Sequence, residues 1–482
     1  MADVNSYKTI LQRISAFGGV QVFNILLTLV RGKFVAMFLG PEGMGISSLL
    51  TSSTSSLQQF AGLGLNLAIV RETAACKDDP ARLRHTLTVV MHLILFTSLL
   101  GALLCVVLSP WLSRWTFGNG DYTWSYIWLG SAVAFLIAGA GYLALLQGLG
   151  EVRRLSKASL VGGLAGLFGG VPLYWLFGVR GIVPAMILMA LVMTAFYYIS
   201  YKRSAPPASG PFLLKEHLPL VKRLISLGFI LMIGSLAGTL VGYLINIFIR
   251  SYGSIDDVGL FQAANSLTNQ YVGIIFSALA LDYFPRLSAI ASDNGAVREV
   301  VNRQTEIVVL IITPLIIALI ATTPLLIRLL LTEEFLSIIP LMRWMGFGML
   351  VQSIAFPLGY IYLAKADRRA YIAMEVIWTN AVWITSSILF YYLYSLIGLG
   401  ISLAVRGIID NTVNYLVCRR RYGFSYTRGV WGVMGICSLL CAAAFAASMA
   451  GGLVCDSVMW SVLVLSVILS ALRLRHGLKS TR

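Results

Sequence analysis

Four ionisable side chains stand in stretches of the chain that are otherwise apolar. Arg31 and Lys33 lie two residues apart in the first apolar run, and Arg406 lies four residues before Asp410 in a later one. A charge near the centre of a bilayer costs about 2.5–3.5 kcal/mol on insertion scales, so such residues are expected to belong to a functional site. Guanidinium and ammonium groups that lack a carboxylate partner bind anions, phosphates especially. The chemistry indicated is therefore anion binding.

Each pair also has a structural interpretation. Arg31 and Lys33 would point about 200° apart on one helix, so one could face a cleft while the other reaches along its aliphatic stem to the membrane surface. Arg406 and Asp410 share a helix face and could neutralise each other, which would position a helix and bind nothing. Both interpretations stay open from the sequence.

Uncharged polar residues also cluster in the apolar runs. Among them are Gln58, Asn66, Asn265 and Asn269. Such side chains would suit a wet cavity that accepts sugars, although hydrogen bonds between packed helices explain many of them equally well. We include these four with Arg31, Lys33, Arg406 and Asp410 as candidate substrate-binding residues.

Composition places these residues in a membrane. Hydrophobic residues make up 58% of the 482 residues and charged residues 12%, against about 25% charged in a soluble domain. Runs of about 20 apolar residues recur along the chain. We predict an all-α polytopic membrane protein with about fourteen transmembrane helices, at 15–39, 44–70, 86–109, 122–149, 157–177, 181–201, 222–249, 259–284, 305–331, 338–363, 371–394, 396–416, 430–450 and 455–473.

The basic residues predict the orientation. Of 36 Lys and Arg residues, 28 fall in segments on the N-terminal side of these spans and three in the opposite loops. This bias predicts that both termini are cytoplasmic. The formal charge of +16 is spread over many cytoplasmic segments rather than gathered in one patch, which argues against a nucleic-acid partner.

Two stretches of the chain resemble each other and predict an internal repeat. Each has a glycine-containing turn between two helices, around Gly40–Gly45 and Gly253–Gly259, followed by a charged loop. Six spans per copy predict parallel repeats with a MATE-like exporter architecture. The predicted organisation is an N-lobe at 1–201, a proline-rich cytoplasmic linker at 202–221, a C-lobe at 222–416, and two further helices with a tail at 417–482.

No motif indicates a cofactor, a metal ion or ATP. The cytoplasmic loops are too short for a nucleotide-binding domain, and no GxxxxGK[ST] or GxGxxG motif has a strand–helix context. The six cysteines form no CxxC pair and no Cys/His cluster, so neither a metal site nor a disulfide framework is indicated.

The first helix and turn carry a family resemblance. The segment from Arg31 to Gly45, RGKFVAMFLGPEGMG, and its continuation Phe60–Gly64 resemble the bacterial polysaccharide flippases, the O-antigen and lipid III translocases of the multidrug/oligosaccharidyl-lipid/polysaccharide exporter superfamily. The resemblance covers about residues 1–420. It implies a cavity role for Lys33, which matches a lysine before the Gly-Pro turn in relatives. The two extra C-terminal helices are shared with lipid II flippases.

The resemblance implies that the protein moves undecaprenyl-pyrophosphate-linked oligosaccharide across the bacterial cytoplasmic (inner) membrane by alternating access. Arg31, Lys33 and Arg406 would attract the pyrophosphate, while membrane lipids surround the polyprenyl tail. We expect a monomer that is not an enzyme, and coupling to protons or sodium ions is compatible with this mechanism. The alternatives are a lipid II flippase, a multidrug/cation antiporter of the same superfamily, a glycan polymerase, for which the outer loops are too short, and a scaffold that transports nothing.

Overall fold

The chain is helical throughout the part that is described. The computed structural model describes residues 2–205, 214–450 and 452–479, with side chains throughout except at 2–22, 214–216, 230–231, 271, 274–275, 277–282, 453 and 476–479. Ten helices within these ranges are long and apolar enough to cross a membrane. Three of the ten cover two predicted spans each, because the chain bends inside them. The predicted all-α polytopic class is therefore confirmed, while the count of fourteen spans stays a prediction.

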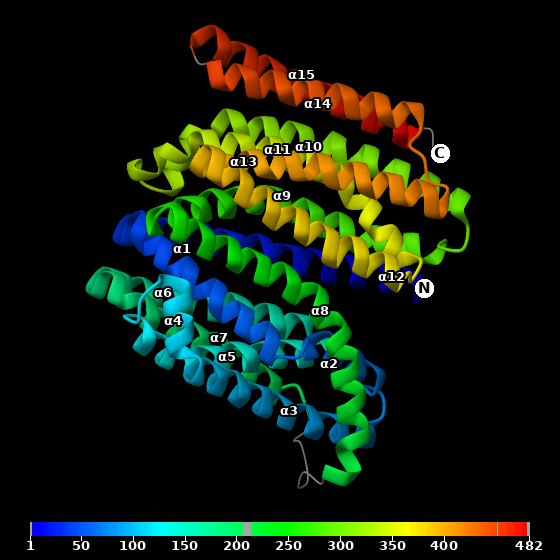
Figure 1. The fold of residues 1–482 in the computed structure, drawn as a ribbon. Helices are drawn as coiled ribbons and strands as arrows, with labels where there is room; N and C mark the ends of the chain where they lie inside the picture. Colours follow the sequence, from blue (N-terminus) through cyan, green and yellow to red (C-terminus); the bar gives the residue numbers. More distant parts are fainter. Residues whose placement is uncertain (1, 206–213, 451, 480–482) are drawn as a thin grey trace. The chain divides into compact units, whose positions relative to one another are not determined.

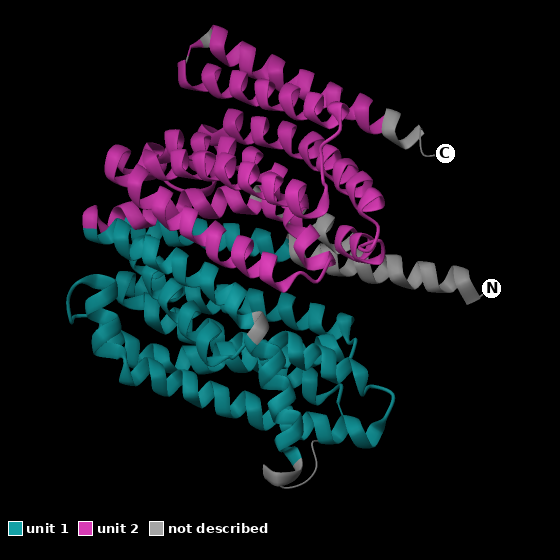
Figure 2. Cartoon of the chain, turned by 45° about the vertical axis from the view of Figure 1, so that its right-hand side comes forward, with its two compact units in different colours: residues 1–251 teal, residues 252–482 magenta. Residues whose placement is uncertain are grey.

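Contacts divide the chain into two compact units, residues 1–251 and 252–482 (Figure 2). The predicted lobes and their repeat stay a prediction. Part of the predicted linker, 206–213, lies outside the described residues, and the rest of it from Leu214 already belongs to a helix. That helix, which is predicted span 7, is grouped by its contacts with unit 1.

The described residues of unit 1 form eight α-helices (Figure 1). They are α1 (Ala2–Ala61), α2 (Leu65–Ala75), α3 (Pro80–Val107), α4 (Ser109–Phe117), α5 (Thr123–Gly148), α6 (Val152–Phe177), α7 (Ile182–Lys202) and α8 (Leu214–Tyr252), with a short 3₁₀ turn at Gly178–Gly181. The core lies among α2, α3, α5 and α7, where Leu87, Leu145 and Leu146 are fully buried.

Unit 2 contains the remaining helices. They are α9 (Ile255–Ala289), α10 (Asn294–Leu330), a 3₁₀ helix (Glu333–Ile338), α11 (Ile339–Ala364), α12 (Arg368–Tyr371), a π-helical segment (Ile372–Trp378), α13 (Thr379–Tyr422), α14 (Arg428–Ala450) and α15 (Leu453–Lys479). Its core is formed by α9, α10, α11, α13 and α14 around Val309, Leu358 and Tyr362. The hairpin of α14 and α15 is tied to α10 by the Ser470 hydroxyl, which donates to the Leu310 carbonyl at 2.6 Å.

The long helices bend where the sequence contains turn residues. In α1 the bend is at Gly40, whose φ of 63° lies in the left-handed region that glycine adopts without a steric cost. Pro41 follows and cannot donate a helical hydrogen bond. In α13 the break falls at Ser395, with a φ of 51°, at the very short turn expected between spans 371–394 and 396–416.

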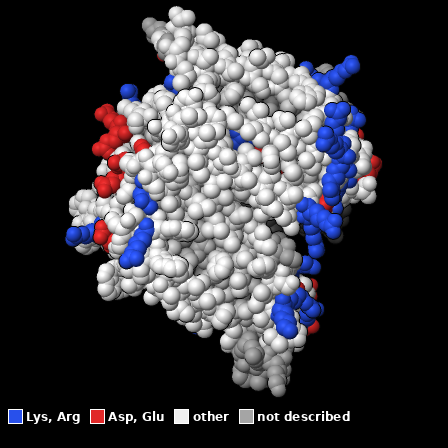
Figure 3. Space-filling model, in the orientation of Figure 1, with Lys and Arg blue, Asp and Glu red and all other residues white. Residues whose placement is uncertain are grey.

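Few charged side chains lie on the surface along the middle of the helices. On the face shown in Figure 3, Lys and Arg gather near the helix ends and the broad band between them is nearly uncharged. At one such end, Asp367 accepts hydrogen bonds from Arg421 at 2.6 Å and Tyr422 at 2.8 Å. Desolvation alone would raise the pKa of Asp367, but these bonds and the one from the Ala370 N–H outweigh it, so the pKa is lowered and the carboxylate stays charged.

A helix break in unit 1 is packed directly against α8. The chain between α1 and α2 turns at Gly62–Gly64, and Gly64 has a φ of 62°. A Cβ on Gly64 would overlap the Gly228 carbonyl oxygen of α8. Any side chain at 64 would therefore meet both backbone strain and a clash with a neighbouring backbone.

We predict that Gly64→Ala lowers stability by about 1–3 kcal/mol, the usual cost of a strained backbone position, with the clash adding to it. Gly432→Ala on α14 is the matched control, because a Cβ there has no neighbour within 4 Å. Thermal unfolding in detergent should show a lower Tm for Gly64→Ala than for the control. Equal values for the two variants would contradict this account of the helix break.

Candidate functional site

Unit 1 encloses a cavity of about 420 Å³ between α1, α5 and α7. Polar side chains come from α1, whose bend at Gly40 brings its two arms to the same cavity, while α5 and α7 supply mainly small and apolar ones. The polar residues from α1 are Arg31, Thr51, Thr54, Ser55 and Gln58. Met186, Met189 and Met193 form a flexible apolar wall on α7. The cavity therefore has one polar side and one apolar side.

Arg31 is the charged residue of this cavity. Its Nη2 donates to the hydroxyl of Tyr174 on α6 at 3.2 Å, and Tyr174 is almost completely buried. Among the described residues that line the cavity, none is a carboxylate. A guanidinium with a neutral hydroxyl as its partner is the arrangement expected of an anion-binding site.

The other candidates of unit 1 lie near this cavity to different degrees. Gln58 lines it and also lines a second cavity of about 40 Å³, which contains Asn66 and the break at Gly62–Gly64. Lys33 is half-buried and is part of neither wall. The structure thus brings Arg31 and Gln58 together, links Asn66 to them through Gln58, and leaves Lys33 outside both cavities, as two residues 200° apart on a helix require.

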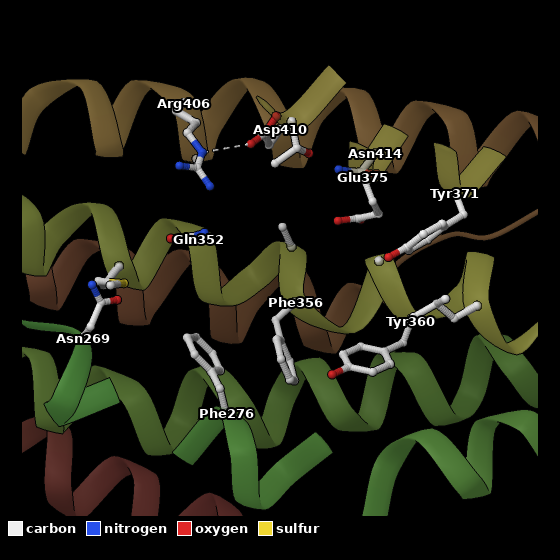
Figure 4. Close-up of a pocket in the computed structure, with 16 residues that line it drawn as sticks. Asn269, Phe276, Gln352, Phe356, Tyr360, Tyr371, Glu375, Arg406, Asp410 and Asn414 are labelled. Carbon is white, nitrogen blue, oxygen red and sulfur yellow. Dashed lines mark hydrogen bonds and ion pairs between the residues drawn. The ribbon is translucent and has the colours of Figure 1, made fainter. Parts of the chain in front are cut away.

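Unit 2 encloses a cavity of about 430 Å³ that contains the second charged pair (Figure 4). The Arg406 Nε lies 3.4 Å from the Asp410 Oδ2, one turn apart on α13, and both side chains are nearly buried. The Arg406 guanidinium carbon also lies 4.9 Å from the centre of the Trp383 ring. These contacts are the ones expected of a pair that positions a helix. The same pair also lines a cavity, so a binding role stays open.

Glu375 adds a second carboxyl group to this wall, and its place could not be read from the sequence. It lies in the π-helical segment, and its side chain points into the cavity (Figure 4). A π-helical turn is wider than an α turn and is frequent at functional sites. Two carboxyl groups share this wall with one guanidinium, so Arg406 is not an unpartnered cation here, and its role in binding pyrophosphate stays a prediction.

The remaining candidates of unit 2 come from α9. Asn269 lines the cavity, and its Nδ2 donates to the Oδ1 of Asn265 at 2.7 Å, so Asn265 supports Asn269. Sequence analysis missed the aromatic residues of the cavity, which are Phe276, Phe356, Tyr360 and Tyr371. A signal was present, because Gln352, Phe356 and Tyr360 recur every four residues and so share one face of α11.

Comparisons with known proteins agree with this architecture. A family model described as "Polysaccharide biosynthesis protein" matches residues 34–340. The chain belongs to this family. It is 28% identical over 352 residues to the lipid III flippases of Escherichia coli (strain K12) and Shigella flexneri, an alignment that covers 72% of this chain and 83% of each relative.

Solved structures of transporters share the fold. A lipid II flippase, MurJ, in an inward closed conformation superposes with a TM-score of 0.72 at 13% identity and covers 97% of this chain and 99% of its own. An inward-facing MATE family multidrug transporter of the MOP superfamily gives 0.68 at 15% identity, covering 83% of this chain and 94% of its own. The predicted exporter fold and the family resemblance are both confirmed.

The two cavities should differ in their response to charge. We predict that a cysteine placed in unit 1 by Ser55→Cys reacts about threefold or more faster with an anionic than with a cationic water-soluble thiosulfonate, because of Arg31. Gln352→Cys in unit 2 should not show this preference. The rates are measured on detergent-purified protein whose native cysteines are replaced.

Arg31→Gln in the Ser55→Cys background is the control for the source of the effect. It should abolish the preference for the anionic reagent while leaving the rate at Gln352→Cys unchanged. A preference that survives the loss of Arg31 would show that the unit 1 cavity does not owe its potential to this residue.

Proposed function

We propose that this protein flips undecaprenyl-pyrophosphate-linked oligosaccharide, an O-antigen or related surface polysaccharide unit, across the bacterial inner membrane. The observation that carries the proposal is the Arg31 cavity, which lies between apolar helices and has no carboxylate among its described lining residues. The relatives that are 28% identical to the chain over 352 residues are lipid III flippases, whose name describes the flipping of a lipid.

The chemistry of the cavity suits the polar part of such a lipid. A pyrophosphate loses its hydration when it leaves water, and Arg31 can replace part of it with charge-assisted hydrogen bonds. Hydroxyl and amide groups of Thr51, Ser55 and Gln58 can donate further ones. The apolar methionine wall can face the first carbons of the lipid. Lys33 supplies a second positive charge on the same helix but outside the cavity. This charge draws the anion toward the cavity.

The proposed transport is by alternating access and makes or breaks no covalent bond, so the protein is not an enzyme. A monomer, coupled to a proton or sodium gradient, is the proposed unit of transport. Lipid II flippase and multidrug antiporter stay as alternatives, but both are represented by fold likeness at 13–15% identity. Loss of drug resistance on deletion, with normal surface glycan, would favour the antiporter.

We predict that Arg31→Gln combined with Lys33→Gln abolishes surface glycan and causes the lipid-linked oligosaccharide to accumulate in cells that depend on this protein. Removing two charges from the anion path leaves the pyrophosphate without its main replacement for water. The measurements are glycan staining and extraction of polyprenyl-linked sugars, which also identifies the oligosaccharide.

The matched control is Arg114→Gln with Arg328→Gln, which removes the same charge from two exposed residues in unit 1 and unit 2. It should export normally, and immunoblots of membranes should show equal amounts of both variants. Dissipating the proton or sodium gradient in wild-type cells should stop export. Full export by the Arg31/Lys33 variant would refute the proposal.

Both termini are proposed to be cytoplasmic, from the distribution of basic residues. Alkaline phosphatase fused after Arg482 should then be inactive and a fluorescent protein at the same place bright, while the reverse should hold for fusions in the loop around Gly120. The basic side of each span favours the cytoplasm by the positive-inside rule. An active phosphatase at the C-terminus would overturn this orientation.

A further inference from the structure

The cavity of unit 2 has an aromatic wall opposite its charged wall (Figure 4). Phe276 of α9 and Phe356 of α11 stack with ring centres 4.7 Å apart and an angle of 22° between their planes. Tyr360 meets Phe356 edge to face at 5.2 Å. A ring face that is not turned to a stacking partner is electron-rich and attracts weakly positive C–H groups.

The opposite wall has polar groups whose hydrogen-bonding capacity is not used. The Arg406 Nε–H donates a hydrogen bond to Asp410. In the described part of the chain, the two terminal nitrogens of Arg406 make no hydrogen bond. The Glu375 carboxylate likewise accepts none from any described residue, while Asp410 has the Arg406 guanidinium and the Trp378 indole beside it. Leaving a buried polar group unsatisfied is costly, so donors and acceptors aimed into one cavity indicate a ligand that supplies both.

We propose that this cavity is a carbohydrate-binding subsite that takes one neutral sugar of the oligosaccharide. That the sugar belongs to a lipid-linked oligosaccharide rests on the proposed function. A pyranose has an apolar C–H face, which fits the Phe276–Phe356 platform, and a rim of hydroxyls. Each hydroxyl both donates and accepts, so different hydroxyls of one sugar can serve Glu375 and Arg406.

Other ligands fit less well. Two carboxyl groups beside a single guanidinium disfavour a further acidic group, such as that of a uronic acid or a phosphate. A metal ion would have to share Asp410 with the Arg406 guanidinium 3.4 Å away, and no group of three metal-ligating side chains occurs among the residues that the structure describes. The volume of about 430 Å³ lies in the range of pockets for small organic ligands and exceeds what a bare ion fills.

The test uses saturation-transfer NMR on the full-length protein in lipid nanodiscs, with N-acetylglucosamine as the probe. Saturation should reach the C–H protons of the sugar. Phe356→Ala removes the platform and Glu375→Gln removes a charged acceptor, and each should weaken binding about tenfold or more. Phe347→Ala, an aromatic loss on the same helix outside the cavity, and Glu306→Gln on α10 are the matched controls and should bind as the wild type does.

Thermal unfolding establishes that each variant is folded, and the wild type alone provides a second measurement. There N-acetylglucosamine should give a larger signal than glucuronate, equally in sodium and potassium buffers. No saturation, a stronger signal for glucuronate, a response that requires sodium, or equal loss in Phe347→Ala would overturn the proposal. The NMR experiment measures binding without transport. Any of these contrary NMR results, together with normal glycan export, would refute the sugar subsite alone. Normal export by the Arg31/Lys33 variant would refute the proposed function alone.

Discussion

A charge inside the hydrocarbon layer must be solvated by something, and this requirement shapes the protein more than any other interaction. Three partly buried arginines among the described residues are held by fixed partners. Tyr174 holds Arg31, Asp410 holds Arg406, and the carbonyls of Trp115 and Thr116 accept from Arg250 at 2.8 and 2.9 Å. Since a guanidinium has five N–H donors, one fixed contact orients the group and leaves the others for a ligand or for neighbouring backbone.

The same requirement explains why helix ends and arginines meet. The last carbonyls of a helix have no partner within it and carry a partial negative charge. Arg250 binds such carbonyls at the end of α4, and Arg343 donates to the Ser448 carbonyl near the end of α14. These contacts fix short or peripheral helices to the long ones, so the charge that the membrane disfavours becomes a cross-link between helices.

The sequence predicts most of the fold because membrane helices are read from composition. Apolar runs, the bend at Gly40–Pro41 and the short turn at Ser395 follow from hydrophobicity and backbone sterics, which are local properties. Arg31, Arg406 and Asp410 are predicted as site residues for the same reason, because a charged residue in an apolar run is recognised from the local sequence. The grouping of α8 with unit 1 depends on contacts far apart in the sequence, such as Gly64 against Gly228, and no local pattern encodes them.

Glu375 and the aromatic platform show where sequence reasoning fails at the sites. The position of Glu375 relative to the membrane surface depends on a π-helical turn, and an aromatic residue in an apolar run looks the same whether it faces lipid or a cavity. Their arrangement has a mechanistic consequence. A transporter must release what it binds, so no contact can be too strong. Under the proposed function, one guanidinium would bind the anion in unit 1, and weak stacking with shared hydroxyl bonds would bind a sugar in unit 2. Recognition would then be distributed over sites that are each modest, which allows selectivity together with release.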